Sequence, residues 1–247
     1  MGCQENPNDN TVEPGSIVFK TFAHTWHSPY CGSDTNLCAK VIASYPMVKG
    51  APSGVGKNIN DSILEFVKYS ITTFQPAPGQ KDITIADLVD EFFEEYRIFT
   101  EDYPDFEMPW SVEIQGKLLY QSPRIVSIEM QEYSYTGGAH PNFNITLFNF
   151  DLLKGQTIRL EDFITDQEKL KAIASEKFRQ ARKIKKGDSL ESAGFLFGDS
   201  FTLPANFALT EEGLYLFYNP YEVGAYVLGP TAFTIPYQEI ESIMVKP

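Results

Sequence analysis

One histidine lies where two sequence signals meet, in the segment YSYTGGAHPNFNITLFNFD of residues 133–151. Aromatic and polar residues alternate on both sides of its GGAHP centre, which predicts two β-strands joined by a corner. Gly137 and Gly138 supply the positive backbone angles that a tight connection needs. His140 carries a titratable imidazole. It is therefore a candidate general base or binding group, but we favour a structural role in which it hydrogen-bonds the turn.

A hydrolase or deacetylase that used His140 as general base would need a carboxylate to orient the ring, and a nucleophile or metal beside it. The other histidines, His24 and His27, are three residues apart in a predicted strand and face opposite sides, so they do not form a metal pair. Glu161 and Asp162 are an acidic pair, but nothing in the sequence marks a perturbed pKa there. We predict no catalytic residue, metal or cofactor, and keep catalysis through His140 as the alternative.

Two other segments resemble catalytic motifs but have simpler interpretations. GAPSGVGKN at residues 50–58 has one residue too many for a phosphate-binding loop, and Asn58 replaces the required Ser or Thr. We expect a loop that leads into a helix. Glu91, Glu94 and Glu95 have helical spacing, which predicts that they form a solvated face.

A second aromatic segment, NPYEVGAY at residues 219–226, places tyrosines on both sides of a glycine. Tyrosine rings can present flat amphipathic faces to sugars or to a protein partner, with the hydroxyl still able to hydrogen-bond. A packed β corner explains this segment equally well. The predicted binding surface combines both segments, and its candidate residues are Tyr135, Gly137, Gly138, His140, Tyr221, Glu222 and Tyr226.

The cysteines carry two further predictions. Cys31 and Cys38 bracket six residues rich in turn formers, and such a loop can bring the two sulfurs into bonding range. We predict a disulfide; two reduced thiols in a cytosolic protein are the alternative.

Cys3 follows Gly2 in MGCQENPNDN, and this Gly-Cys pair resembles the end of a bacterial lipobox. We predict that Cys3 is lipidated and that residues 1–15 form a tether. The protein would then be a lipid-anchored lipoprotein of the bacterial envelope, periplasmic or surface-exposed, where a disulfide persists. A disordered N-terminus is the alternative. No apolar run approaches the roughly 18 residues that span a bilayer, so the lipid would be the only membrane attachment.

Charge limits the class of partner. The formal charge is -13, from 20 Lys and Arg against 33 Asp and Glu, which argues against nucleic-acid binding and favours a cationic partner. Eight basic residues lie between Lys169 and Lys186. They alternate with an apolar stripe at helical spacing, which predicts the solvated face of an amphipathic helix.

The fold class predicted from these patterns is α+β, with antiparallel sheets and amphipathic helices packed on one face. Alternation predicts strands at 17–26, 37–48, 111–120, 124–135 and 142–151. Helices are predicted at 58–69, with Asn60 or Asp61 as its cap, and at 82–99. A short strand ending in LEDF, the basic helix and two or three further strands complete the chain.

YSYTGGAHP, then FNFDLLKGQTIRLEDFI, then GLYLFYNPYEVGAYVLGPTAFTIPYQEI occur in an order and spacing that resembles a known arrangement. It is similar to the paired domains of unknown function in the extracytoplasmic region of the lysozyme-sensing anti-sigma factor RsiV, and beside the catalytic domain of the peptidoglycan deacetylase PdaC. The resemblance implies a PdaC/RsiV-like domain at residues 16–147 and an RsiV-like domain at 148–247.

The resemblance also implies a function. In RsiV the corresponding region binds lysozyme, whereas in PdaC the resemblance is to the accessory region alone. We therefore expect a noncatalytic envelope module that binds a cationic protein such as lysozyme, or a peptidoglycan glycan. The sequence shows neither a transmembrane helix nor a sigma-binding segment, so a role in sigma-factor control is not expected.

Overall fold

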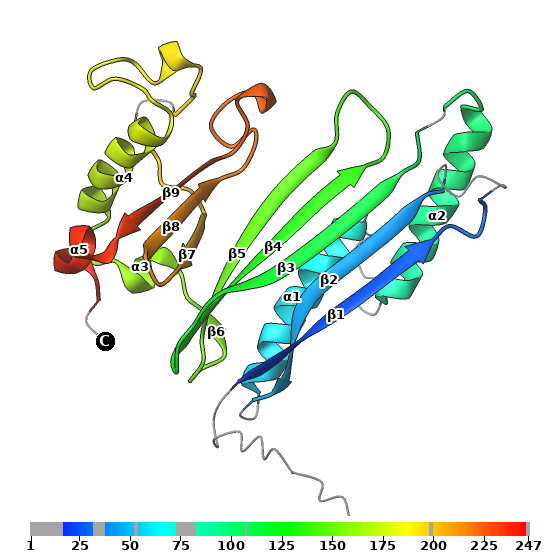
Figure 1. The fold of residues 1–247 in the computed structure, drawn as a ribbon, viewed down its shortest axis with the longest axis horizontal. Helices are drawn as coiled ribbons and strands as arrows, with labels where there is room; N and C mark the ends of the chain where they lie inside the picture. The colour runs from blue at the N-terminus through cyan, green and yellow to red at the C-terminus, as the bar shows by residue number, and fades with distance from the viewer. Residues whose placement is uncertain are drawn as a thin grey trace, which may run out of the picture.

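The computed structural model describes residues 17–31, 38–51, 54–72, 83–106, 108–197 and 200–245. Its architecture is two sheets side by side, each carrying its own helices (Figure 1). The predicted α+β class is confirmed. Cys3 and the predicted tether at residues 1–15 lie outside the described residues.

The larger sheet has six strands in the order β1-β2-β3-β4-β5-β6. All neighbours are antiparallel except β2 and β3, which run parallel and are therefore joined by a long crossover that contains α1 and α2. The other pairs agree with the antiparallel sheets that we predicted, and this parallel pair is the exception. The strands are β1 (Val18–His27), β2 (Lys40–Gly50), β3 (Ser111–Gln121), β4 (Ile125–Tyr135), β5 (Asn142–Asp151) and β6 (Gln156–Thr157).

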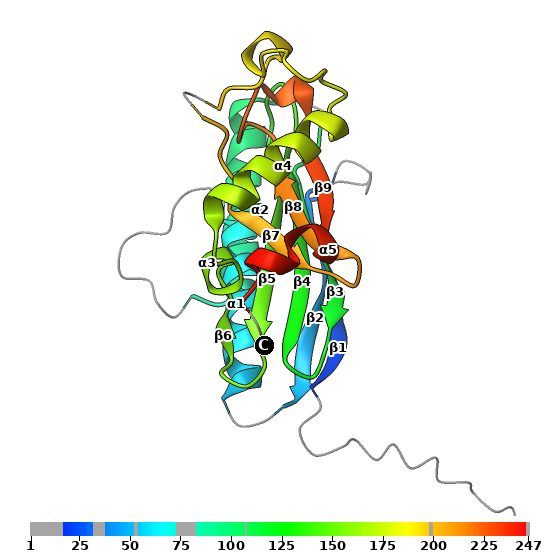
Figure 2. The same ribbon diagram turned by 90° about the vertical axis from the view of Figure 1, so that its left-hand side faces the viewer.

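Helices α1 (Val55–Ile71) and α2 (Ile85–Asp102) cover one face of this sheet (Figure 2). Their apolar residues recur at helical spacing and face a single core beneath them. α2 begins with a capping box, in which Thr84 and Asp87 each accept the other's backbone N–H. Along the described chain, no helix has both the length and the apolar character needed to cross a membrane.

The predicted start of α1 is wrong. The helix begins at Val55, after Gly54 with a φ of 85°, and Asn60 lies inside it. The Asn60 carboxamide accepts from the Val48 backbone N–H at 2.8 Å and donates to the Val48 carbonyl at 3.1 Å. Asn60 therefore satisfies the backbone of β2 rather than a helix end, and this pairing fixes α1 against the sheet.

The smaller sheet contains β7 (Asn206–Leu209), β8 (Gly213–Tyr218) and β9 (Thr231–Pro236), and α4 (Gln167–Ala181) packs on it. Phe178 of α4 is fully buried among edge-on aromatic rings, including Phe195 and Tyr218. Short helices complete this half of the molecule: α3 (Leu160–Phe163), α5 (Tyr237–Ile240), η2 (Glu191–Ala193), η3 (Tyr226–Leu228) and η4 (Glu241–Ile243).

The LEDF segment is helical rather than the end of a strand. Residues Leu160–Phe163 form α3, and the reason is a local cap: Asp162 accepts from the backbone N–H of Arg159 at 3.0 Å. The basic helix is confirmed as α4, but it ends at Ala181. The last basic residues of the segment therefore lie in the following loop.

The two sheets meet along β5 through asparagine side chains rather than through strand pairing. Asn149 donates to the Phe207 carbonyl at 2.7 Å and accepts from the Leu209 N–H at 3.0 Å. Asn206 accepts from the Leu147 N–H at 3.1 Å, and donates to the Ile145 carbonyl at 2.8 Å. We call these contacts the asparagine junction. The predicted domain boundary at 147/148 falls inside β5 and stays a prediction.

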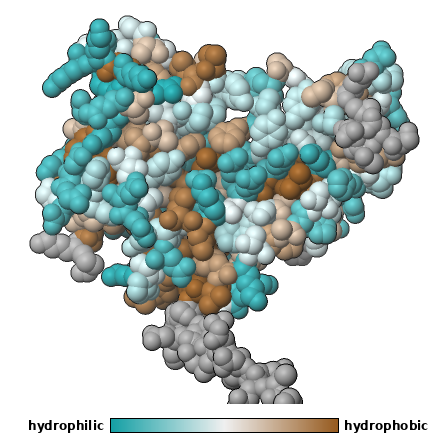
Figure 3. All heavy atoms as spheres, in the orientation of Figure 1, coloured by the Kyte–Doolittle hydropathy of each residue, from teal (hydrophilic) through white to brown (hydrophobic). Residues whose placement is uncertain are grey.

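Apolar side chains surround the junction. Ile145 and Leu147 of β5 pack with Ala208 and Phe217 of the smaller sheet. On the face drawn in Figure 3, hydrophobic residues form a band through the middle of the molecule, where the two sheets meet, and hydrophilic residues gather over α4. The junction is therefore a small core that holds the two halves together.

Candidate functional site

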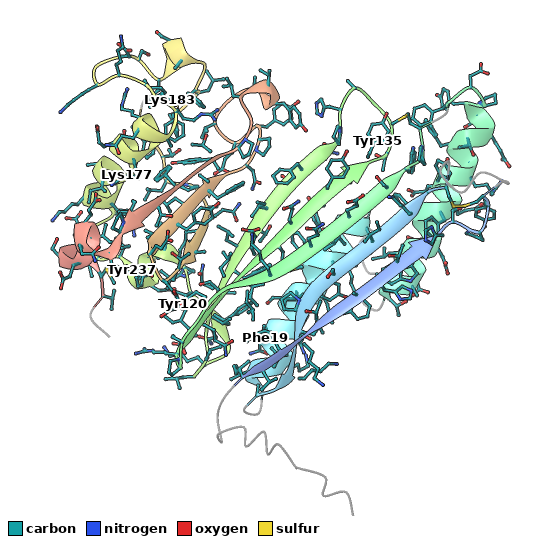
Figure 4. The ribbon with its side chains drawn as sticks, viewed as in Figure 1. Phe19, Tyr120, Tyr135, Lys177, Lys183 and Tyr237 are labelled. Carbon is teal, nitrogen blue, oxygen red and sulfur yellow. A yellow bond between two sulfur atoms is a disulfide. The ribbon has the colours of Figure 1, made fainter. Side chains whose placement is uncertain are left out.

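The GGAHP corner connects β4 and β5, as predicted, and we use "corner" for residues 137–141. Gly137 and Gly138 have φ values of 93° and 103°, a conformation that L side chains rarely adopt. Tyr135, at the end of β4 (Figure 4), donates its hydroxyl to the Gly138 carbonyl at 3.3 Å. The corner therefore has a defined conformation set by its glycines.

One side of the corner rests on the aromatic cluster at the end of α2. A Cβ built on Gly137 would lie 3.7 Å from the rings of Phe99 and Phe106, and 3.8 Å from the Trp110 nitrogen. These rings also contact one another, with Phe99 and Trp110 centroids 5.1 Å apart. The helix-covered half of the molecule thus supports the corner from beneath.

The other side of the corner meets the NPYEVGAY loop, 81 residues further along the chain. The His140 ring stacks on Tyr226, with centroids 4.0 Å apart and an interplanar angle of 13°. Its Nε2 lies 3.1 Å from the Tyr221 hydroxyl, and the Tyr226 hydroxyl donates to the Pro141 carbonyl at 2.9 Å. The structure therefore places in contact the two segments that the predicted binding surface combines. We call His140, Tyr221 and Tyr226 the aromatic clasp.

Both nitrogens of His140 have neutral partners. Nδ1 lies 2.9 Å from the Pro141 carbonyl, which can only accept, so in the neutral ring the proton is on Nδ1. Nε2 then accepts from the Tyr221 hydroxyl. Within the described part of the chain no carboxylate hydrogen-bonds the ring, and no group of three or more His, Cys, Asp or Glu side chains is placed to hold a metal ion. This geometry is that of a fixed, hydrogen-bonded histidine.

Tyr221 is exposed over 63% of its surface and has a φ of 68°, the left-handed region that a residue with a side chain seldom occupies. Two contacts hold the loop in this conformation. The Glu222 carboxylate accepts from the Asn219 N–H at 2.8 Å, and the Asn219 side chain accepts from the Ile145 N–H of β5 at 2.8 Å. The loop is fixed to the larger sheet, so an exposed ring is held in one place.

Glu222 stabilises the turn of the NPYEVGAY loop. Burial of its carboxyl raises the pKa of Glu222, and hydrogen bonds from the backbone of Asn219 and Ala205 act in the opposite direction. Its carboxylate closes the loop on which Tyr221 stands. A direct contact between Glu222 and a ligand stays a prediction.

Sequence reasoning missed Arg182. Its guanidinium donates to the carbonyl of Leu228, the last residue of η3, and to that of Pro230 just after it. The guanidinium also lies 4.7 Å from the centre of the Phe195 ring. Because Tyr226 opens η3, Arg182 holds the segment that carries the stacking ring. In the sequence Arg182 is one of the eight basic residues between Lys169 and Lys186, and nothing distinguishes it from the other seven.

The other candidate residues are separate from this site. Cys31 and Cys38 form the predicted disulfide, with Cα atoms 5.2 Å apart. The predicted solvated face of α2 is partly wrong, because Glu95 is half-buried and its Oε2 has no hydrogen-bond partner among the described residues. Asp162 is held by Arg159, whose hydrogen bonds lower the pKa of Asp162, so this carboxyl stays ionised rather than acting as an acid.

These features define a two-part α+β protein whose halves meet at an exposed aromatic clasp. Comparison with known proteins is consistent with this division. A family model described as "Deacetylase PdaC" matches residues 33–143, and one described as "Protein of unknown function (DUF3298)" matches residues 161–238. The chain therefore carries paired domains that resemble the PdaC accessory region.

Individual relatives support the same assignment. The peptidoglycan-N-acetylmuramic acid deacetylase PdaC of Bacillus subtilis is 26% identical over 140 residues, which are 53% of this chain and 28% of that protein. The chain thus spans less than a third of this relative. Crystal structures of DUF3298 family proteins from Bacteroides fragilis and Pseudomonas aeruginosa have TM-scores of 0.71 and 0.70 at 19% identity. Both comparisons cover 94% of this chain and 95% of the other, and they show the fold. The resemblance to RsiV stays a prediction.

Proposed function

We propose that this protein is a noncatalytic binding module of the bacterial cell envelope, and that the aromatic clasp binds a peptidoglycan glycan. The observation that supports this most is the exposed ring of Tyr221, held in a left-handed backbone conformation against His140. Backbone strain of this kind persists only where the surroundings enforce it, and it occurs often at ligand contacts. A fixed aromatic ring loses little entropy when a sugar stacks on it.

The likeness to PdaC favours a glycan over other ligands. That relative is named as a deacetylase of peptidoglycan N-acetylmuramic acid. The matched residues 33–143 reach the corner and include His140. A domain that accompanies such an enzyme has a use for contacts to the same polymer. The clasp offers the exposed Tyr221 ring as a stacking face, together with a hydroxyl oxygen that can still accept a hydrogen bond.

A cationic protein such as lysozyme is the second candidate, and the formal charge of -13 favours it. Long-range attraction would speed its association and would weaken as salt screens it, with a Debye length of about 10 Å at 0.1 M. Stacking of a neutral sugar on the clasp would depend little on salt. The two ligands are therefore distinguished by their response to ionic strength.

The lipid anchor is part of this proposal. Cys3, next to Gly2, would carry the lipid and place the binding module in the envelope, periplasmic or surface-exposed. Full-length protein made with a secretion signal should then fractionate with membranes, and Cys3→Ser should release it. A Cys3→Ser protein that stays with membranes after a high-salt wash argues against the anchor without touching the binding proposal.

Sedimentation of the purified protein with insoluble peptidoglycan, at low and at physiological salt, tests the function. We expect cosedimentation that changes little with salt. Binding to lysozyme alone, lost as salt rises, would replace the glycan with a cationic protein as ligand. The same samples should be assayed for released acetate and for cleaved glycan. Turnover that His140→Ala abolishes, in a protein that remains folded, would establish the hydrolase or deacetylase alternative.

A further inference from the structure

A cavity of about 440 Å³ opens at the end of the molecule opposite the corner. It lies between the turn that joins β3 to β4, the turn that joins β5 to β6, helix α3 and the C-terminal segment. Its volume is in the range of small-ligand sites. It shares no residue with the aromatic clasp.

Two cations line this cavity, and each lies beside a carboxylate without a hydrogen bond from its own side chain: Arg124 is ion-paired with Asp151, and Lys154 acts on Asp162 through its charge. The Arg124 Nε is 4.0 Å from Asp151 Oδ2, too far for a hydrogen bond. Over the ranges that the structure describes, neither the Arg124 guanidinium nor the Lys154 ammonium has a hydrogen-bond acceptor. Both cations therefore keep N–H donors that a bound ligand could use.

The two carboxylates of the cavity are, by contrast, mostly occupied. Asp151 Oδ1 accepts from the backbone N–H groups of Leu153 and Lys154, at 2.8 and 3.2 Å. Asp162 accepts from the backbone N–H and the side chain of Arg159, at 3.0 and 3.2 Å. Only Asp151 Oδ2 remains without a hydrogen-bond donor among the described residues. The cavity thus offers N–H donors of two cations to an anion and, beside them, one carboxylate oxygen that is ion-paired with Arg124 but accepts no hydrogen bond among the described residues.

Apolar side chains complete the lining: Ile125, Ile158, Phe163 and Val245. They can contact a small aliphatic group that a carboxylate carries with it. Arg124 and Lys154 balance the formal charge of Asp151 and Asp162. A ligand with one negative charge therefore suits the cavity better than a dianion, which both carboxylates would repel.

We propose that this cavity binds the C-terminal carboxylate of a short peptide with a small aliphatic last residue. The carboxylate accepts from Arg124 and Lys154, the last peptide N–H donates to Asp151 Oδ2, and the side chain lies on the apolar lining. Hydrogen bonds to a charged guanidinium are the strong ones, and they give planar recognition of a carboxylate. The inference is independent of what the clasp binds.

Calorimetric titration of the full chain with N-acetyl-alanyl-alanine, and with its C-terminal amide, tests this inference. We expect the acid to bind and the amide to bind at least about 10-fold more weakly, because the charged contacts are lost. Arg124→Gln and Lys154→Gln should each weaken binding of the acid by about 10-fold. Lys185→Gln, which removes the same charge from an exposed lysine outside the cavity, should change it less than about 2-fold.

Four results would overturn the inference. The first is equal binding of the acid and the amide, and the second is an acid affinity that Arg124→Gln and Lys154→Gln leave unchanged. The third is no binding of the acid at millimolar concentration to protein whose thermal unfolding is normal. Inorganic phosphate titrated in parallel should bind more weakly than the peptide; tighter phosphate binding, the fourth result, assigns the cavity to a dianion instead. Tyr221→Ala should leave peptide binding unchanged.

Discussion

Strand β5 joins the two halves of the molecule at two places that differ in chemistry. At the asparagine junction, the Asn149 side chain is 2% exposed and hydrogen-bonds backbone groups of β7. At the aromatic clasp, beside the start of β5, Tyr221 is 63% exposed and meets His140 through a single hydrogen bond. One contact is buried and polar, the other exposed and aromatic.

The difference separates stability from recognition. Removing a buried carboxamide leaves its backbone partners unsatisfied, which costs much more than the net value of the bonds themselves. Removing an exposed ring leaves only solvent-accessible groups behind. We therefore expect changes at the junction to lower stability, and changes at the clasp to lower binding.

Asn149→Ala should give the largest loss of stability. It removes the bonds to the Phe207 carbonyl and the Leu209 N–H, and the acceptor of the Ser127 hydroxyl. We expect a loss of about 3 kcal/mol in the free energy of unfolding. Urea denaturation measures it. Asn144→Ala, in the same strand but exposed, is the control and should change stability by less than about 0.5 kcal/mol. If Asn149→Ala and Asn144→Ala lower the free energy of unfolding equally, the asparagine junction does not have the special role in stability that we give it.

The Cys31–Cys38 disulfide lies away from β5, so its reduction should lower stability without changing the aromatic clasp. With a sequence separation of 7, the chain-entropy estimate gives a loss of about 2 to 3 kcal/mol on reduction. Peptide mapping without reductant checks the bond, and denaturation with and without reductant measures its effect. Ligand binding by the folded protein should not change. If reduction weakens ligand binding while the protein stays folded, binding at the clasp depends on the distant disulfide, contrary to our expectation.

Tyr226→Phe tests the clasp itself. The variant keeps the stacked ring but loses the hydroxyl bond to the Pro141 carbonyl. We expect a stability loss of about 1 kcal/mol or less, since the Pro141 carbonyl still accepts from His140 Nδ1. Binding should weaken modestly, because the corner and loop become less firmly connected. A loss as large as that of Asn149→Ala would mean that the clasp holds the two halves together as strongly as the junction does.

Glu132 gives the smallest effect, and it depends on pH. This residue of β4 is 9% exposed and pairs in register with Asn144, and burial raises the pKa of Glu132. The folded state then holds a proton that the unfolded state releases near pH 4.3, so stability falls as pH rises above that value. Glu132→Gln should flatten this fall in urea denaturation between pH 4 and pH 7, whereas Glu65→Gln, exposed on α1, should not. An unchanged slope in Glu132→Gln contradicts the assignment.

Local patterns were enough to predict much of the fold. The corner, the strands on both sides of it, the disulfide and the amphipathic helix α4 all follow from residues close together in the chain. Where a tertiary contact overrode a local signal, the prediction failed. Asn60 looks like a helix cap, but the Val48 backbone occupies its carboxamide, so α1 begins earlier.

Predictions about the site also failed where they depended on tertiary contacts. The sequence analysis combined His140 and Tyr221 in one candidate surface by residue type, yet no local pattern shows that residues 81 positions apart lie within 3.1 Å. The left-handed backbone conformation of Tyr221 could not be predicted either, because Gly or Asn usually occupies such a turn position. The conformation depends on the hydrogen bond between Glu222 and Asn219. Arg182 acts on a loop 46 residues away and looked like any other basic residue.

The central claim is that Tyr221 contacts the ligand while contributing little to stability. Titration of a soluble peptidoglycan glycan fragment into wild-type, Tyr221→Ala and Tyr69→Ala protein tests it most directly. Tyr69 is the matched control, a tyrosine of α1 that is 74% exposed. We expect Tyr221→Ala to weaken binding about 10-fold or more with an unfolding free energy within about 1 kcal/mol of wild type, and Tyr69→Ala to match wild type. Equal affinities for all three proteins would contradict the account.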